Sequence, residues 1–105
     1  LSSNVISMRN NKGEHTYVCV VHVSVEKTLP KQYYHMFVML DANMCPIYFS
    51  QIFYFDAYGP EYCLGLHSDK GHYILWISRK DRNPLCIVIE KTKIEFRNKI
   101  AKESK

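Results

Sequence analysis

A glycine-free, aromatic-rich run at positions 33–56 constrains the fold of this chain more than any other feature. Its 24 residues hold eight of the fourteen aromatic side chains, and only the turn-like segment 41–46 interrupts it. Aromatic and β-branched side chains favour a pleated, half-buried surface. Because Asp, Asn and Pro residues break the run once, it predicts two long strands paired as a hairpin.

Length and cysteine usage indicate one domain over residues 1–105. A chain of 105 residues can bury a core without disulfides or metal. Its four cysteines are widely spaced and form no CxxC pair, which favours reduced thiols in an intracellular protein, with one or two disulfides in a secreted protein as the alternative. We favour the nucleus over the cytoplasm. The start at Leu1 instead of Met suggests a domain cut from a longer protein.

Alternation of side chains predicts strands on either side of the central hairpin. Residues 16–25 alternate as one long strand, and residues 73–77 and 85–89 form a second hairpin. The interval 57–71 contains three glycines, which favours a short helix or an irregular crossover, with a strand over 62–66 as the alternative. Residues 1–15 are polar and predict a flexible or short-stranded extension.

The last fifteen residues, 91–105, predict a basic C-terminal helix. They lack strand alternation, and Phe96 and Ile100 lie one helical turn apart. Together with five strands over residues 16–90, this helix predicts a mainly β fold. The expected architecture is a small antiparallel five-stranded barrel, because closing the sheet protects its edges.

The order of these segments resembles an OB-fold over about residues 16–100. The resemblance is carried by a long strand, Tyr33–Asp41, a turn, Pro46–Ser50, a crossover and the hairpin of residues 71–89. The chain departs from this family in having no glycine within the first strand, where many such barrels bend.

A PH-like domain is the rival, because Phe37–Asp41 followed by Ile47–Phe49 resembles the second hairpin of that fold. Its seven strands would require Val5–Met8 or Tyr62–Leu66 to be strands. Trp76 counts against it, because this residue lies in a strand, whereas PH-like domains usually carry a Trp in the final helix.

Positive charge is concentrated at the C-terminal end. Residues 91–105 carry six basic and two acidic side chains, which accounts for the whole net charge of +4. The balanced body argues against a dedicated duplex-binding protein. Any attraction to phosphate is expected at a basic anchor made of Lys91, Lys93, Arg97 and Lys99.

No catalytic motif is present, so we expect a protein that is not an enzyme and has no catalytic residue, metal or cofactor. The densest reactive cluster is Cys63, His67, Asp69 and His72. A thiol–imidazole pair or a zinc site requires such groups to converge. We expect a structural Cys63 beside exposed histidines.

The central hairpin supplies the functional hypothesis. If Tyr34, Met36 and their alternates face the core, the other row faces outward and forms an apolar patch typical of a protein-docking surface. This row and its continuation on the next strand are Tyr33, His35, Phe37, Met39, Tyr48, Ile52 and Tyr54.

The expected partner of this surface is another protein or a second copy, within a complex that handles nucleic acid. The alternative is direct binding of single-stranded DNA or RNA by an OB-like barrel, or of anionic lipid by a PH-like one. Burial of both faces of the hairpin by the rest of the domain also stays open.

Overall fold

Seven β-strands make up nearly all of the regular structure in the computed structural model, which describes residues 3–9, 12–25, 32–55, 61–79 and 83–98, without the side chains of Ser24, Val25 and Gln32. The strands are β1 (Ile6–Arg9), β2 (His15–Val25), β3 (Gln32–Leu40), β4 (Pro46–Phe49), β5 (Glu61–Asp69), β6 (His72–Arg79) and β7 (Leu85–Glu90). The described part contains one 3-10 turn, at Lys91–Lys93, and no helix long and apolar enough to cross a membrane.

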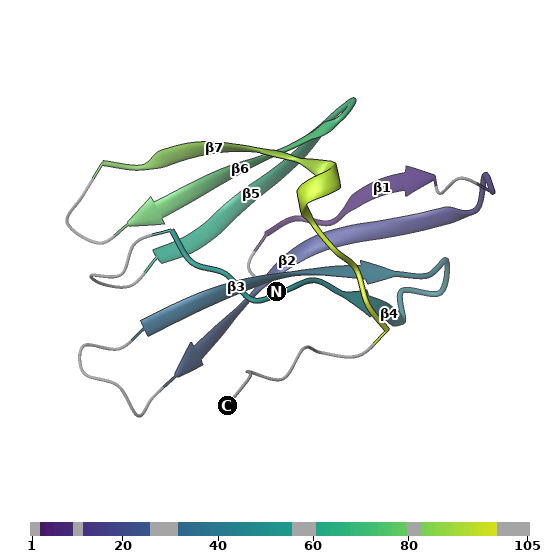
Figure 1. Ribbon diagram of the computed structural model, residues 1–105, viewed down its shortest axis with the longest axis horizontal. Coiled ribbons are helices and arrows are strands. Elements are labelled where there is room, and N and C mark those ends of the chain that lie inside the picture. The colour runs from purple at the N-terminus through teal and green to yellow at the C-terminus, as the bar shows by residue number, and fades with distance from the viewer. Residues whose placement is uncertain (1–2, 10–11, 26–31, 56–60, 80–82, 99–105) are drawn as a thin grey trace.

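The strands form two antiparallel sheets that follow the chain order. One has the order β1-β2-β3-β4 and the other the order β5-β6-β7, and they lie as two layers in Figure 1. The mainly β prediction is confirmed. The five-stranded closed barrel is wrong, because the strand ladders stay within each sheet and do not close.

The main core fills the space between the two layers. From the four-stranded sheet, β2 and β3 contribute Val18, Val20 and Phe37, all fully buried. The three-stranded sheet contributes Cys63, Leu66, Tyr73, Leu75 and Ile77. The rings of Phe37 and Tyr73 approach to 4.8 Å between centroids, so aromatic packing joins the two sheets directly.

Ser3 and Asn4 bridge the sheets where β2 approaches β5. The backbone N–H of Ser3 donates to Val20 O, and Ser3 Oγ accepts from Val20 N–H at 2.8 Å. The amide of Asn4 donates to Leu66 O at 2.9 Å and accepts from Leu66 N–H at 2.8 Å. One side chain thus satisfies both backbone groups of Leu66 at this edge of β5.

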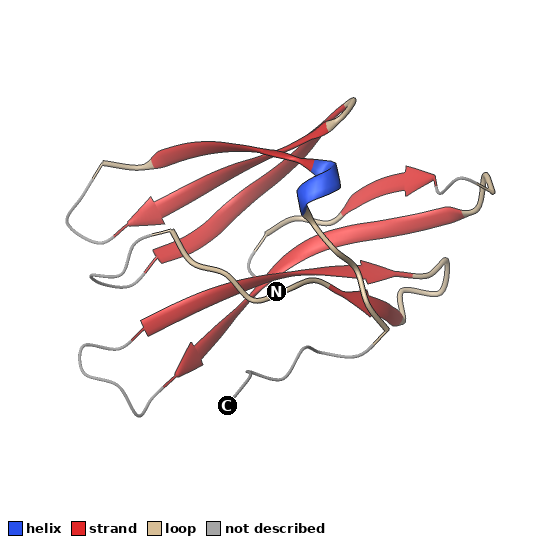
Figure 2. Cartoon of the chain, viewed as in Figure 1, coloured by secondary structure: helices blue, strands red, loops and turns tan. Residues whose placement is uncertain are grey.

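Residues 91–98, called the strap below, connect the three-stranded sheet to β4 of the four-stranded sheet. The strap leaves β7 through the 3-10 turn, buries Ile94 in the core, and pairs Arg97 with Phe49 of β4. Figure 2 shows the short 3-10 turn in blue at its start and, after it, a loop that runs from one layer to the other. The predicted C-terminal helix is therefore wrong for residues 91–98, while residues 99–105 lie outside the described part.

β5 occupies most of the interval for which the sequence favoured a helix or crossover. Its register against β6 shifts between Cys63 and Gly65, so Leu64 is an extra residue in a β-bulge. The bulge allows both Cys63 and Leu66 to be buried, although three positions separate them. Simple alternation cannot place both on one face, which explains why the pattern did not read as a long strand.

The second strand of the central hairpin is shorter than expected. β4 ends at Phe49, and Ser50 turns its hydroxyl inward to accept the Phe37 N–H at 2.8 Å. Phe49 packs on the outer face of the sheet, whereas Phe53 and Phe55 pack against the main core. These three phenylalanines therefore do not share one face, because the strand breaks at Ser50.

Candidate interaction surface

The central strand β3 presents its two faces in the opposite sense to the prediction. His35 and Phe37, expected outside, are 0% exposed and face the other sheet. Tyr33 and Met39 are half-buried on the same face. The first part of the predicted docking row is therefore not an available surface.

His35 is held by a polar contact inside the core. Its Nε2 lies 2.9 Å from Oε1 of Glu61, and both side chains are fully buried. The same carboxylate oxygen accepts the Phe55 N–H at 2.7 Å. The pair links β3 to the start of β5 within a shell formed by the rings of Phe53 and Phe55, so it has a structural place between the sheets.

The other face of β3, expected to be core, forms a second apolar cluster on the outer side of the four-stranded sheet. Cys19, Met36, Val38 and Leu40 are buried there. A shallow apolar groove of about 440 Å³ runs over them, between Val5 and the Met44 turn. The middle of β3 is thus buried on both faces, which is the outcome the sequence had left open.

The second part of the predicted row remains at the surface. Tyr48, Ile52 and Tyr54 are exposed, and the ring of Tyr54 meets that of Tyr34 edge to face at 5.6 Å. These side chains lie on β4 and the segment after it, separated from the buried residues of β3. The structure does not bring the seven predicted residues together on one face.

An exposed apolar row crosses the outer face of the three-stranded sheet instead, and is called the outer row below. Leu64 is 67% exposed, Val88 60% and Trp76 53%. The register places Trp76 beside Cys86 and Ile74 beside Val88. The outer row consists of the exposed Leu64, Trp76, Cys86 and Val88 and the half-buried Ile74.

The geometry of β5 is what exposes the centre of this row. Trp76 lies opposite Gly65, where an added Cβ would be 3.2 Å from Cδ1 of the indole. The ring therefore lies across the glycine, and the bulge directs Leu64 outward beside it. In the sequence, the signal for this surface is the alternation of Ile74 and Trp76 with Tyr73, Leu75 and Ile77.

Three rings meet at the end of the sandwich where β2 and β5 approach each other, and are called the aromatic trio below. Tyr62 lies 5.1 Å from Tyr33 and 5.9 Å from His22, measured between ring centroids. A side-chain hydrogen bond with Tyr33 raises the pKa of the Tyr62 hydroxyl. His22 and Tyr62 are exposed, so the trio offers ring surface to solvent.

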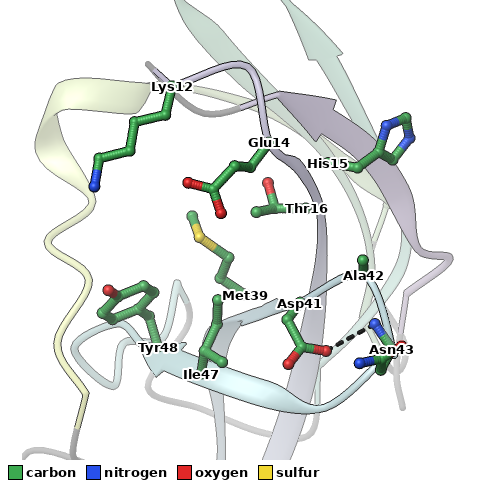
Figure 3. Close-up of a pocket in the computed structure, with 10 residues that line it drawn as sticks. All are labelled: Lys12, Glu14, His15, Thr16, Met39, Asp41, Ala42, Asn43, Ile47 and Tyr48. Carbon is green, nitrogen blue, oxygen red and sulfur yellow. Dashed lines mark hydrogen bonds between the residues drawn. The ribbon is translucent and has the colours of Figure 1, made fainter.

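A wide pocket of about 880 Å³, lined by both polar and apolar side chains, lies between the connection after β1 and the β3–β4 turn (Figure 3). Its charged walls are one ammonium, Lys12, and two carboxylates, Glu14 and Asp41. Asp41 Oδ1 accepts the N–H groups of Asn43 and Cys45, so this carboxylate organises the turn. The net negative charge of these walls does not favour a phosphate ligand.

The predicted basic anchor is distributed along the strap. Lys91 lies over the ring of Tyr73 at 5.4 Å, Lys93 is exposed, and Arg97 Nη2 lies 3.3 Å from Glu95 Oε2. Lys99 is outside the described residues. Residues 91–98 form no α-helix, so the described part of the basic anchor does not lie on the predicted C-terminal helix.

The reactive cluster of the sequence does not converge. Cys63 points into the core, and burial raises the pKa of its thiol to about 11. His67, Asp69 and His72 are exposed. Among the described residues, no three His, Cys, Asp or Glu side chains are grouped so that they could hold a metal ion.

No protein-family model, curated protein or solved structure matches this chain.

Proposed function

We propose that this chain is a non-enzymatic interaction module that docks an apolar surface of a partner protein on the outer row. The observation that carries the proposal is the exposure of three large apolar side chains, Leu64, Trp76 and Val88, on one face of one sheet. Contiguous exposed apolar patches on a folded domain mark interaction sites. This replaces the β3 row as the docking surface.

The character of the row supports a protein partner over a phosphate-bearing ligand. Tryptophan is enriched among the residues that dominate binding energy at interfaces, because its large ring can be fully desolvated by a partner. Trp76 is backed by Gly65 and flanked by Leu64, Cys86 and Val88, none of them charged. Burial of apolar surface, with little dependence on salt, would therefore supply the affinity.

The experiment compares Trp76 and Leu64 on the three-stranded sheet with Tyr54, an exposed ring on the segment after β4. The immobilised chain captures proteins from a lysate, and capture is repeated with Trp76→Ser, Leu64→Ser and Tyr54→Ser. We expect the first two variants to lose the same captured protein by at least about tenfold, and Tyr54→Ser to retain it. A photoreactive residue at position 64 should crosslink to that protein. Loss with Tyr54→Ser alone would place docking on the four-stranded sheet and overturn the proposal.

A second candidate function, binding of single-stranded nucleic acid, is favoured by the aromatic trio. Exposed rings can stack bases, and His22, Tyr33 and Tyr62 are in mutual contact at one end of the molecule. The test is the fluorescence anisotropy of a labelled oligothymidine from low to high salt, since phosphate binding weakens steeply with salt. Binding that Tyr62→Ala removes would support this function, and no binding at low salt would exclude it for this probe.

For the finer fold, we propose the PH-like alternative over the OB-like one. The sheets of four and three strands provide the seven strands that the PH-like reading requires, and both β1 and β5 are among them. The described part of the C-terminal region, however, is the strap and not a capping helix.

Vesicles containing anionic lipid test the lipid-binding function expected of a PH-like fold. The carboxylates of the pocket in Figure 3 lead us to expect no binding there.

A further inference from the structure

Within the described part of the chain, no backbone or side-chain group occupies the outer edge of β7. Arg97 pairs with Phe49 at the edge of β4, and the amide of Asn4 occupies the edge of β5 at Leu66. β1 is only four residues long and exposes Ser7 and Arg9. β7 has six residues, only the last of which is charged, and within the described part it pairs with β6 alone. Such an edge is a template for another strand.

The ladder between β6 and β7 defines which backbone groups point to this open edge. Lys91 N–H donates to Gly71 O at 2.8 Å, and the register continues without a shift from the His72–Glu90 pair to the Ile77–Leu85 pair. In an antiparallel ladder, alternate residues bond to opposite neighbours. Residues 85, 87 and 89 therefore bond to β6, while Cys86, Val88 and Glu90 direct their N–H and C=O groups outward.

We propose that a second copy of this chain pairs with this edge, antiparallel, with Val88 opposite Val88 on a two-fold axis. This register sets Cys86 of each copy opposite Glu90 of the other, so the outward N–H and C=O groups of all three residues are paired. Opposite β-branched residues stabilise such a ladder. Pairing through one self-complementary patch closes the assembly as a dimer.

Neighbouring registers satisfy this edge less well. Moving the axis to Ile87 sets Glu90 opposite Pro84, which has no N–H to donate. Moving it to Ile89 sets Cys86 opposite Thr92, which lies in the 3-10 turn and not in the strand. Moving it to Glu90 sets two like charges opposite each other, which is destabilising. The register centred on Val88 avoids all three defects.

The dimer would also enlarge the docking surface proposed above. This consequence rests on the proposed function, whereas the dimer itself does not. Paired residues in an antiparallel ladder point to the same face, so the two outer rows would lie on one side of a continuous sheet, with the two Val88 side chains between them. A partner would then meet a doubled apolar platform. The pairing itself needs no partner and is tested without one.

Sedimentation equilibrium of the purified chain gives the first test. We expect a mass of twice 12.4 kDa for the wild type at concentrations of about 100 μM or above. Val88→Pro removes an N–H that points outward, so the mass should fall to that of one chain while the fold persists. The matched control, Ile89→Pro, removes an N–H bonded to β6 and should unfold the chain instead.

A second variant guards against loss of folding in Val88→Pro. Val88→Lys keeps the N–H and places two like charges face to face on the axis, so the dimer dissociation constant should rise at least about tenfold. A wild type that stays at 12.4 kDa at all concentrations overturns the dimer. Loss of the dimer in Trp76→Ser but not in either Val88 variant would indicate face-to-face packing and also overturn it.

Crosslinking tests the register. In a chain with Cys45→Ser and Cys86→Ser, Val88→Cys should form a disulfide between copies on mild oxidation, because opposite residues in a ladder lie within disulfide reach. Leu64→Cys in the same background is the control and should not crosslink. A dimer in which Val88→Cys fails to crosslink contradicts the proposed register. Failure of partner docking with an intact dimer would affect only the proposed function.

Discussion

The two sheets of this protein carry the same kind of alternating sequence and use it differently. In the four-stranded sheet, β3 is buried on both faces at Met36, Phe37 and Val38. In the three-stranded sheet, β6 buries Tyr73, Leu75 and Ile77 but leaves Trp76 more than half exposed. A central strand with two apolar rows fits the first case, and a sheet with one solvated face fits the second.

This difference shows that apolar character alone does not identify a docking face. The row of β3 that contains Phe37 is as aromatic as the outer row, yet it serves the core because β5 and β6 lie over it. The outer row stays available because no described element covers β6 on that side. The predictions below test this contrast, from the largest expected effect to the smallest.

The largest effect is expected when an aromatic side chain is truncated in each sheet and the two losses of stability are compared. Phe37→Ala empties a fully buried site and should cost about 3–5 kcal/mol of the free energy of unfolding. Trp76→Ala, at an exposed site, should change it by less than about 0.5 kcal/mol. Urea denaturation followed by circular dichroism measures both. Similar losses for the two variants would break the comparison.

A smaller loss is expected at the polar link between the sheets. Glu61→Ala removes the partner of His35 and the acceptor of Phe55 N–H, and each buried group left unsatisfied costs about 1–3 kcal/mol. The control is the double variant His35→Phe with Glu61→Met, which removes both buried side-chain polar groups and should lose less than Glu61→Ala. Equal losses would show that packing, and not the polar contact, determines the cost.

The bridge at β5 should contribute about 1 kcal/mol. Asn4→Ala removes the amide that pairs with Leu66 N–H and C=O, while Asn4→Asp keeps an acceptor for the N–H and should lose less. Hydrogen exchange of the Leu66 amide is the readout, because this amide should lose its protection first in Asn4→Ala. Unchanged exchange would mean that this edge is held elsewhere.

The four thiols report exposure without disturbing the fold. Cys45 and Cys86 are exposed and should react with iodoacetamide at pH 8, whereas the buried Cys19 and Cys63 should not. Mass spectrometry after limited labelling distinguishes the four sites. Rapid labelling of Cys63 in the folded chain would contradict its burial between the sheets.

The Cys63 thiol also predicts a direction for the pH dependence of stability. Burial raises its pKa from 9.0 in the unfolded reference to about 11 in the fold. Above pH 9 the unfolded chain therefore releases this proton before the folded chain does. The free energy of unfolding should fall through this interval, and Cys63→Ala should reduce the slope. A slope that is the same in both proteins would remove Cys63 as a contributor.

Much of the secondary structure could be predicted from the residues themselves. The break at Asp41–Pro46, the long strand before Val25 and the hairpin of β6 and β7 all follow from alternation and turn residues. The strand β5 confirms the alternative for its interval, a strand over 62–66. It was not the favoured prediction, because the bulge at Leu64 breaks its alternation. The prediction of a terminal helix was wrong for residues 91–98. It relied on the spacing of Phe96 and Ile100, which is also compatible with an extended segment, and Ile94 is the residue that is buried.

The candidate site was harder to predict from the sequence than the fold. Both faces of β3 are apolar, so the side that would meet the other sheet could not be decided from β3 alone. Cys86 and Val88 alternate with half-buried apolar neighbours, so their side of the strand is as apolar as the core side, and their exposure depends on what lies opposite. One signal for the exposed face was present in the sequence. Trp76 lies on the opposite side of its strand from Tyr73, Leu75 and Ile77.

The amino-acid sequence by itself determined that this protein is built from strands and where several of them turn, since backbone preferences and alternation act over a few neighbouring residues. Only the tertiary structure decided which row became core and which stayed in water. That choice depends on how the three-stranded sheet lies over β3, and contacts between residues far apart in the chain are set by the packing of the whole molecule.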